Sequence, residues 1–145
     1  MIQRIQSILL LISGLGFLGQ FATDFATSSQ PLPQLLADQR YEVQDSPLLL
    51  ILVVAGFLLS AAAVFLYQNR VLQMRITLLS LVTGILLPLL AYFLMYKEGS
   101  EVPAGVTVDD ALGAYLPIVS IISSAVAMRF IKKDDQLVKS MDRLR

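Results

Sequence analysis

The sequence contains no cysteine, no histidine and no tryptophan. Without cysteine the chain has neither disulfides nor thiolate nucleophiles, and without histidine it lacks the imidazole that binds metals and serves as an acid or base near neutral pH. The remaining carboxylates, amines and hydroxyls form no catalytic triad, metal cluster, phosphate-binding loop or nucleic-acid patch. We therefore predict a protein that is not an enzyme, holds no metal or cofactor and binds no nucleic acid.

Charged residues are scarce as well, at 15% of the chain, whereas 56% of the residues are hydrophobic. The charges are missing from four apolar stretches of about 18 to 21 residues each. A helix of that length, at about 1.5 Å per residue, crosses the roughly 30 Å hydrocarbon core of a bilayer. Buried helices of a soluble bundle would each need a polar face, and the stretch LLLILVVAGFLLSAAAVFLY has none.

We predict an all-α membrane protein with a single domain over residues 1–145. Its four transmembrane helices are expected at about 5–24, 48–68, 74–96 and 109–131, joined by outer loops 27–46 and 97–108 and followed by an amphipathic cytoplasmic helix at 132–145. The first stretch also has the length of a signal peptide. Because only Arg4 precedes it and small-x-small cleavage patterns are poor, we interpret it as a retained signal anchor.

The distribution of lysine and arginine predicts the orientation in the membrane. One predicted side carries nine of the eleven basic residues and three acids, and it includes both ends of the chain. The opposite side carries only Arg40 and Lys97 against eight acids. We therefore expect both termini in the cytoplasm of a bacterial cell and the protein in its inner membrane.

The two outer loops carry different local signals. In the first, Leu32, Leu35 and Leu36 are expected to lie on the outer membrane surface, and the segment RYEV is expected to pair as a short strand. In the second, Thr107 is the candidate cap of the fourth helix. The carboxylates that follow it would then occupy the first turn, where they complement the positive end of the helix dipole.

Small residues recur at four-residue spacing in the apolar stretches. Such spacing allows helices to approach closely and allows hydroxyls to bond across the interface. Two interpretations are open: packing within one bundle, or a face for a partner subunit. The positions concerned are Gly14, Gly56, Ser60, Ser80, Gly84, Ser120 and Ser124.

Two prolines stand within the predicted helices. Pro88 and Pro117 would each remove a backbone hydrogen bond and bend the third and fourth helices. Such a bend is either a packing kink or the wall of a cleft sized for a lipid or a quinone, with Tyr92 and Tyr115 as polar groups. The cleft would favour a second function, a small transporter or a lipid- or quinone-binding module.

The last seventeen residues, RFIKKDDQLVKSMDRLR, carry six basic residues and three acids. On a helical projection Phe130, Leu137, Met141 and Leu144 form one apolar stripe, and Asp135 is placed to pair with Lys139 at i,i+4 spacing. This pattern is typical of a helix that either continues the fourth span or lies on the inner membrane surface. It acts either as a topology anchor or as a partner-binding helix.

The two ends of the chain, MIQRIQSILLL and RFIKKDDQLVKSMDRLR, closely resemble those of a bacterial four-helix membrane family catalogued as domain of unknown function 4293. The resemblance implies four membrane spans and brings no activity or catalytic residue with it. We hypothesise that both ends are recognised on the cytoplasmic side, with Arg4 pairing to Asp134 or Asp135 beside Lys132 and Lys133. The leading functional prediction is a non-catalytic accessory, scaffold or assembly subunit, with the lipid bilayer and other membrane-protein subunits as partners.

Overall fold

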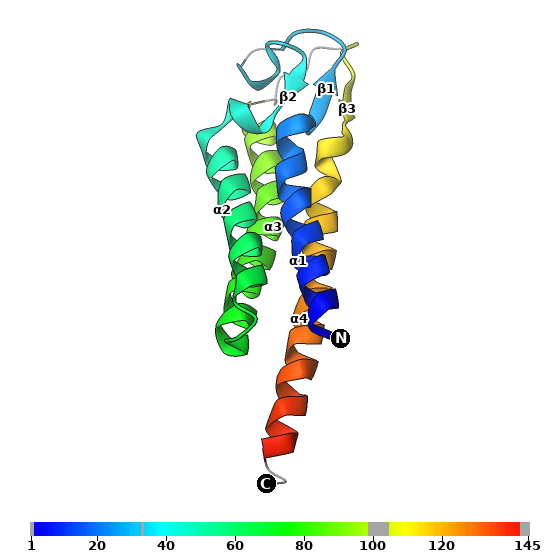
Figure 1. The fold of residues 1–145 in the computed structure, drawn as a ribbon. Coiled ribbons are helices and arrows are strands. Elements are labelled where there is room, and N and C mark those ends of the chain that lie inside the picture. Colours follow the sequence, from blue (N-terminus) through cyan, green and yellow to red (C-terminus); the bar gives the residue numbers. More distant parts are fainter. Residues whose placement is uncertain (1, 33, 99–104, 143–145) are drawn as a thin grey trace.

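A computed structural model describes residues 2–32, 34–98 and 105–142 of the chain. Four long α-helices, α1 (Ile2–Gly19), α2 (Pro47–Phe65), α3 (Arg70–Glu98) and α4 (Leu116–Asp142), run up and down beside one another (Figure 1). Each helix packs against the next in the chain, and α1 also packs against α4, so the bundle closes on itself. This arrangement confirms the four predicted long helices and a mostly helical chain.

A small antiparallel sheet covers one end of the bundle, which we call the sheet end; the opposite end, where α4 projects, is the tail end (Figure 1). The sheet has the order β2 (Arg40–Tyr41), β1 (Ala26–Ser28), β3 (Val108–Asp110). In register, Thr27 of β1 lies opposite Arg40 on one side and Asp109 on the other. The strand predicted at RYEV is present over its first two residues, whereas Val43 begins a 3-10 turn. The short 3-10 turns are η1 (Gln20–Ala22), η2 (Gln34–Leu36), η3 (Val43–Asp45) and η4 (Leu112–Ala114).

The fourth helix begins later than the sequence predicts. The predicted cap, Thr107, directly precedes β3, and the carboxylates expected in the first turn, Asp109 and Asp110, lie in β3, where their extended backbone completes the sheet beside β1. The helix starts at Leu116, so Pro117 occupies its first turn, where the N–H that proline lacks would have no helical partner in any case. The predicted bend at Pro117 is therefore wrong, whereas Pro88 does lie inside α3.

The other helix boundaries follow from local chemistry. Pro47 opens α2 at a position that proline favours. A tight turn joins α2 to α3, and the Asn69 side chain accepts a hydrogen bond from the Leu72 N–H (3.1 Å), which caps α3. At the tail end α4 continues without a break to Asp142 and projects beyond the other three helices (Figure 1). The predicted tail helix is therefore the last part of α4.

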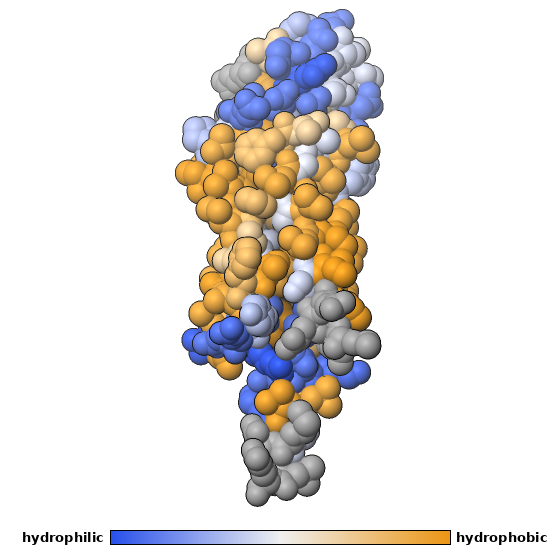
Figure 2. Space-filling model, viewed as in Figure 1, coloured by the Kyte–Doolittle hydropathy of each residue, from blue (hydrophilic) through white to orange (hydrophobic). Residues whose placement is uncertain are grey.

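The outside of the bundle is apolar between two polar ends (Figure 2). In the described part of the chain, four helices are long and apolar enough to cross a membrane, which is consistent with a multi-pass membrane protein. Large side chains such as Leu15, Leu58 and Leu89 are more than half exposed on this surface. In water such a surface would be unstable, whereas against lipid tails it needs no cover.

The buried positions of all four helices repeat with alternating three- and four-residue spacing. This repeat is the left-handed, knobs-into-holes pattern of a coiled coil. The positions are Gln6, Leu10, Ser13, Phe17 and Gln20 from α1 and η1; Leu49, Val53, Gly56, Ser60 and Ala63 from α2; Gln73, Thr77, Ser80, Gly84, Leu87 and Ala91 from α3; and Pro117, Ser120, Ser124, Ala127 and Ile131 from α4.

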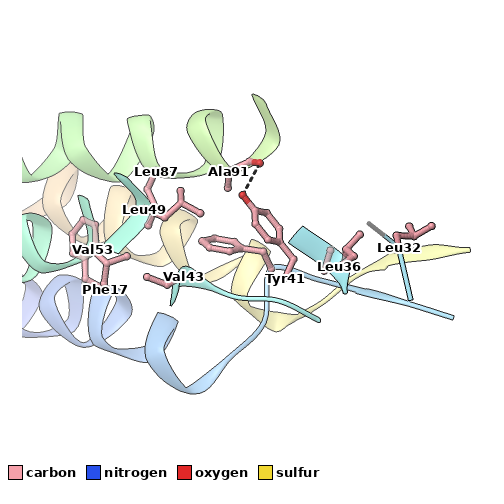
Figure 3. Close-up of a cluster of buried hydrophobic side chains, with 11 residues drawn as sticks. Phe17, Leu32, Leu36, Tyr41, Val43, Leu49, Val53, Leu87 and Ala91 are labelled. Atoms are coloured by element: carbon pink, nitrogen blue, oxygen red, sulfur yellow. Dashed lines mark hydrogen bonds between the residues drawn. The ribbon is translucent and has the colours of Figure 1, made fainter. Parts of the chain in front are cut away.

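An apolar cluster fills the bundle at the sheet end (Figure 3). Phe17, Leu49, Val53 and Leu87 come from the helices, and the sheet and loops add the others. Tyr41 is 1% exposed, and its hydroxyl donates a hydrogen bond to the Ala91 carbonyl (3.1 Å). Leu32 and Leu36 are buried in this cluster, 7% and 5% exposed, with Leu35 packed against it. The expectation that these leucines lie on the membrane surface is therefore wrong, because the loop folds back over the open end of the bundle.

Candidate functional site

Four serine hydroxyls meet in the middle of the bundle, one from each helix. Ser60 Oγ lies 2.7 Å from Ser80 Oγ and 3.2 Å from Ser13 Oγ. Ser13 Oγ in turn lies 2.8 Å from Ser124 Oγ, so the chain of contacts runs α3, α2, α1, α4. We call Ser13, Ser60, Ser80 and Ser124 the serine layer. All four side chains are fully buried, and each hydroxyl has at least one partner, which removes the cost of placing a polar group in an apolar interior.

Further polar side chains lie above and below the serine layer along the same buried positions. Ser120 donates to the Ser13 carbonyl (3.0 Å), and Gln73 donates to the Ala63 carbonyl (2.9 Å) near the end of α2. Thr77 donates to the Gln73 carbonyl within α3 (2.8 Å). The Ser120 and Gln73 contacts connect neighbouring helices, whereas the Thr77 contact stays within α3. The interior of the bundle therefore carries more polar groups than its lipid-facing surface.

The small residues that the sequence singles out all lie within this interior. A side chain at Gly56 would run into the ring of Phe17, and one at Gly16 would run into Ser120 Oγ. Gly84 faces Ile121 and Phe17. These glycines and the neighbouring serines are buried between helices of one chain, which leaves them out of reach of a partner subunit. Buried in this way are Gly14, Gly56, Ser60, Ser80, Gly84, Ser120 and Ser124.

Two buried amide atoms have no hydrogen-bond partner among the described residues: Gln6 Nε2 and Gln20 Oε1. Gln20 is satisfied on its other side, because its Nε2 donates to the Gly113 carbonyl (3.0 Å). Gly113 also donates its N–H to the Asp24 carbonyl (2.8 Å) at so close an approach that a Cβ there would strike that carbonyl. Gln20 and Gly113 therefore tie the end of α1 to the turn before α4.

A mostly apolar pocket of about 240 Å³ opens at the sheet end beside α3. Pro88, Ala91, Tyr92 and Met95 form its α3 wall. The facing wall comes from the sheet and from η4 and consists of Phe25, Ala26, Tyr41, Asp110 and Ala114. Of the four residues predicted to form a bend or cleft, Pro88 and Tyr92 line this pocket, whereas Pro117 and Tyr115 do not.

At the tail end an ion pair connects the α2–α3 turn with α4. Arg70 Nη2 lies 3.1 Å from Asp134 Oδ2, and Arg70 Nη1 donates to the Asp134 carbonyl (2.7 Å), with both side chains largely buried. Asp135 pairs with Lys139 at 2.6 Å, which confirms the expected i,i+4 pair. The side chain of Arg4 lies outside the described residues, and the partner that the structure gives Asp134 is Arg70.

Beyond this ion pair the tail is exposed. Leu137 is 45% exposed, Phe130 is half-buried, and Lys132 and Lys133 both face outward. The side chain of Met141 and the whole of Leu144 lie outside the described residues. The described part of the predicted apolar stripe therefore consists of Phe130 and Leu137.

The sheet end carries mostly acidic side chains. Asp24 is half-buried and lies 3.9 Å from Arg40, which is itself 63% exposed. Burial raises the pKa of the Asp45 carboxyl above its usual 3.8; the Glu42 N–H that donates to it (2.6 Å) acts in the opposite direction. The carboxylates of Asp38 and Asp24 raise this pKa further. Among the residues that the structure describes, no group of three or more acidic side chains is placed to hold a metal ion.

The four-residue spacing predicts Ser60, Ser80, Ser120 and Ser124 but not Ser13. The Ser13 hydroxyl contacts those of Ser60 and Ser124. Its signal was present, since Ser13 is a polar residue within the apolar stretch ILLLISGLG and precedes Gly14. Reasoning from the sequence also missed Tyr41 and Asp110 as pocket residues. Tyr41 comes from β2 and Asp110 from β3, and they lie on the same pocket because both strands pair with β1.

Comparison with known proteins gives one match. The model of a family described as domain of unknown function (DUF4293) matches residues 2–144. No curated protein and no solved structure matches the chain. The match covers both ends and all four helices, and it confirms the resemblance seen in the two end segments.

Proposed function

The chain belongs to the DUF4293 family, and from this premise we propose that it is a non-catalytic accessory, scaffold or assembly subunit of a larger complex in the bacterial inner membrane. The observation that carries the proposal is the projection of α4 beyond the bundle. The helix continues to Asp142 and presents the exposed Leu137 where the other helices have ended. An isolated helix end of this length is marginal in water, and a partner surface would stabilise it.

Two further observations support a scaffold over a reaction centre. The serine layer uses its hydroxyls to hold the four helices together, because each hydroxyl is already bonded to another helix. The sequence provides no thiol and no imidazole. The Arg70–Asp134 pair fixes α4 to the α2–α3 turn at the level where the tail emerges, which would hold the tail in one direction for a partner.

We further propose that the tail end and both termini lie in the cytoplasm. The tail end carries most of the lysine and arginine, and the sheet end carries most of the acids. Because the chain has no native cysteine, single cysteines report the topology cleanly. Gln136→Cys, at the tail end, should react with a membrane-impermeant maleimide only after permeabilisation of spheroplasts. Gln44→Cys, exposed at the sheet end, should react without it, and the reverse pattern would contradict the orientation.

The accessory role is tested through the exposed face of the tail. Leu137→Glu should lower co-purification of the partner proteins in mild detergent by about tenfold or more, because it places a charge where an apolar side chain is expected to be buried. Gln136→Glu adds the same charge at the neighbouring exposed position, off the apolar stripe, and should retain the partners. A protein that purifies alone, without stoichiometric partners, would refute the role. Equal losses of partner proteins in both variants would show that the apolar face with Leu137 is not the partner-binding surface.

A further inference from the structure

Exposed aromatic side chains show where the bundle crosses the membrane interfaces. At the sheet end Tyr92, Tyr96 and Tyr115 are 72%, 71% and 55% exposed, and at the tail end Phe65 and Tyr67 are 78% and 49% exposed. Tyrosine prefers the headgroup level, where its ring is in apolar surroundings and its hydroxyl is in water. The pocket has Tyr92 in its lining and therefore opens at this level, between headgroups and acyl chains.

The α3 wall of the pocket suits an alkyl chain. Pro88, Ala91 and Met95 are apolar, and they extend from the tyrosine level toward the middle of the bundle. The volume of about 240 Å³ is below the roughly 300–1,000 Å³ of most small-molecule sites. The pocket therefore accommodates a segment of a chain rather than an entire ring-containing ligand such as a quinone.

The opposite wall supplies a negative charge at the rim. Asp110 lines the pocket from β3, and its carboxylate makes no ion pair or hydrogen bond with the residues that the structure describes. The nearest candidate cation on the sheet, Arg40, lies beside Asp24 instead. Asp109, the residue before Asp110, is also exposed, but it does not line the pocket. Successive side chains of a strand point to opposite faces of the sheet.

We propose that this pocket is a binding site for a bilayer lipid whose headgroup carries a primary ammonium. One acyl chain lies against Pro88, Ala91 and Met95, and the ammonium lies beside the Asp110 carboxylate. The apolar wall provides most of the binding, and the carboxylate selects between headgroups, because an anionic headgroup at the same place would be repelled. The site does not depend on the proposed accessory role.

The test uses the full chain in mild detergent and native mass spectrometry, with phosphatidylethanolamine and phosphatidylglycerol of identical acyl chains. The wild type should retain phosphatidylethanolamine over phosphatidylglycerol by about threefold, as expected for an ion pair at a solvent-exposed rim. Asp110→Asn should abolish this preference while both lipids still bind. Asp109→Asn, the matched control, should retain it. Phosphoethanolamine without acyl chains should not compete.

Filling the pocket tests the apolar wall separately. Ala91→Leu, and Met95→Phe as a second variant, should lower retention of both lipids by about tenfold, with helicity and thermal unfolding used to select folded variants. Three results would overturn the proposal: equal retention of the two lipids by the wild type, loss of the preference in Asp109→Asn as well as in Asp110→Asn, or unchanged lipid retention in a folded variant with a filled pocket.

Discussion

The half of the bundle next to the sheet and the half next to the tail have different interiors. At the sheet end large apolar side chains such as Phe17, Leu49 and Leu87 fill the space between the helices, and a folded loop covers them. From the serine layer toward the tail most of the buried side chains that the structure describes are small or polar, although Leu10, Ala63 and Ala127 form a small apolar cluster and Ile131 is also buried.

This difference follows from what surrounds each half. In the membrane arrangement proposed above, the sheet end protrudes into water, where burial of Phe25 and Tyr41 under the loop is favoured by the hydrophobic effect. Between lipid tails there is no such gain, because the tails are as apolar as leucine, and helices associate through close packing and hydrogen bonds. One short bundle thus uses two sources of stability, and substitutions in the two halves should separate them.

The largest effect is expected at the boundary between the halves. Phe17→Ala should lower the free energy of unfolding by about 3–5 kcal/mol, because it leaves a cavity between Gly56 and Gly84. Circular dichroism during titration with a denaturing detergent measures the change. Leu15→Ala, on the lipid-facing side of the same helix, should cost less than about 1 kcal/mol. Equal costs would show that Phe17 is not a core residue.

The serine layer should respond less strongly. Ser13→Ala should lower the free energy of unfolding by about 1–2 kcal/mol, since it removes a partner from both Ser60 and Ser124. The same detergent titration applies. Thr83→Val is the matched control, because the Thr83 hydroxyl bonds only to Leu79 of its own helix and should change stability by less than about 0.5 kcal/mol. If the two variants agree, the serine layer does not connect the helices.

One polar contact at the sheet end allows a direct comparison with the serine layer. Tyr41→Phe removes the hydroxyl that donates to the Ala91 carbonyl and should cost about 1 kcal/mol, while the ring keeps its packing. Tyr92→Phe, at an exposed position, should be nearly neutral. Thermal unfolding of both variants in one detergent checks the difference. A neutral Tyr41→Phe would mean that the sheet end is stabilised by apolar burial alone.

The smallest effect concerns the pH dependence of the sheet end. The pKa of Asp45 is raised in the folded state, so this residue contributes stability below its usual pKa of 3.8, and that contribution is lost as the pH rises through the folded value. The Asp45→Asn variant should not lose this stability as the pH rises, and it should be at least as stable as the wild type at neutral pH. Thermal unfolding between about pH 3 and pH 7 tests it. An Asp45→Asn variant that loses stability with rising pH as steeply as the wild type would contradict this assignment.

The four helices could be predicted because each includes most of an apolar stretch of about 18 to 21 residues without a charged side chain. Hydropathy did not predict which face of each helix is buried. α2, for example, is apolar all round, so no side of it is marked for burial. The small residues partly replaced that signal, and Gly56 and Ser60 do lie in the interior. The role of Ser13 could not be predicted from α1 alone, because it depends on the other three helices, which place their serines at the same level of the bundle.

The sheet could be predicted only in part, for a physical reason. β2 has a local signal in Arg40 and Tyr41. β1 and β3 are three residues each and stabilise one another by pairing, although α2 and α3 separate them in the sequence. Asp109 and Asp110 have the pattern of a first helical turn, and pairing with β1 overrides that local preference. The pocket shares this dependence, because its charged wall is β3.

The position of β1 at the centre of the sheet also has a consequence for the assembly of the protein in the membrane. β2 follows β1 closely in the chain, so their pairing needs only the loop between α1 and α2. β3 comes after α3, so in the proposed membrane arrangement a chain in which one of the two helices α2 and α3 fails to cross the bilayer places β3 on the opposite side from β1. In that arrangement the three-stranded sheet forms in chains that have inserted both α2 and α3, and it does not form in chains that have inserted only one of them.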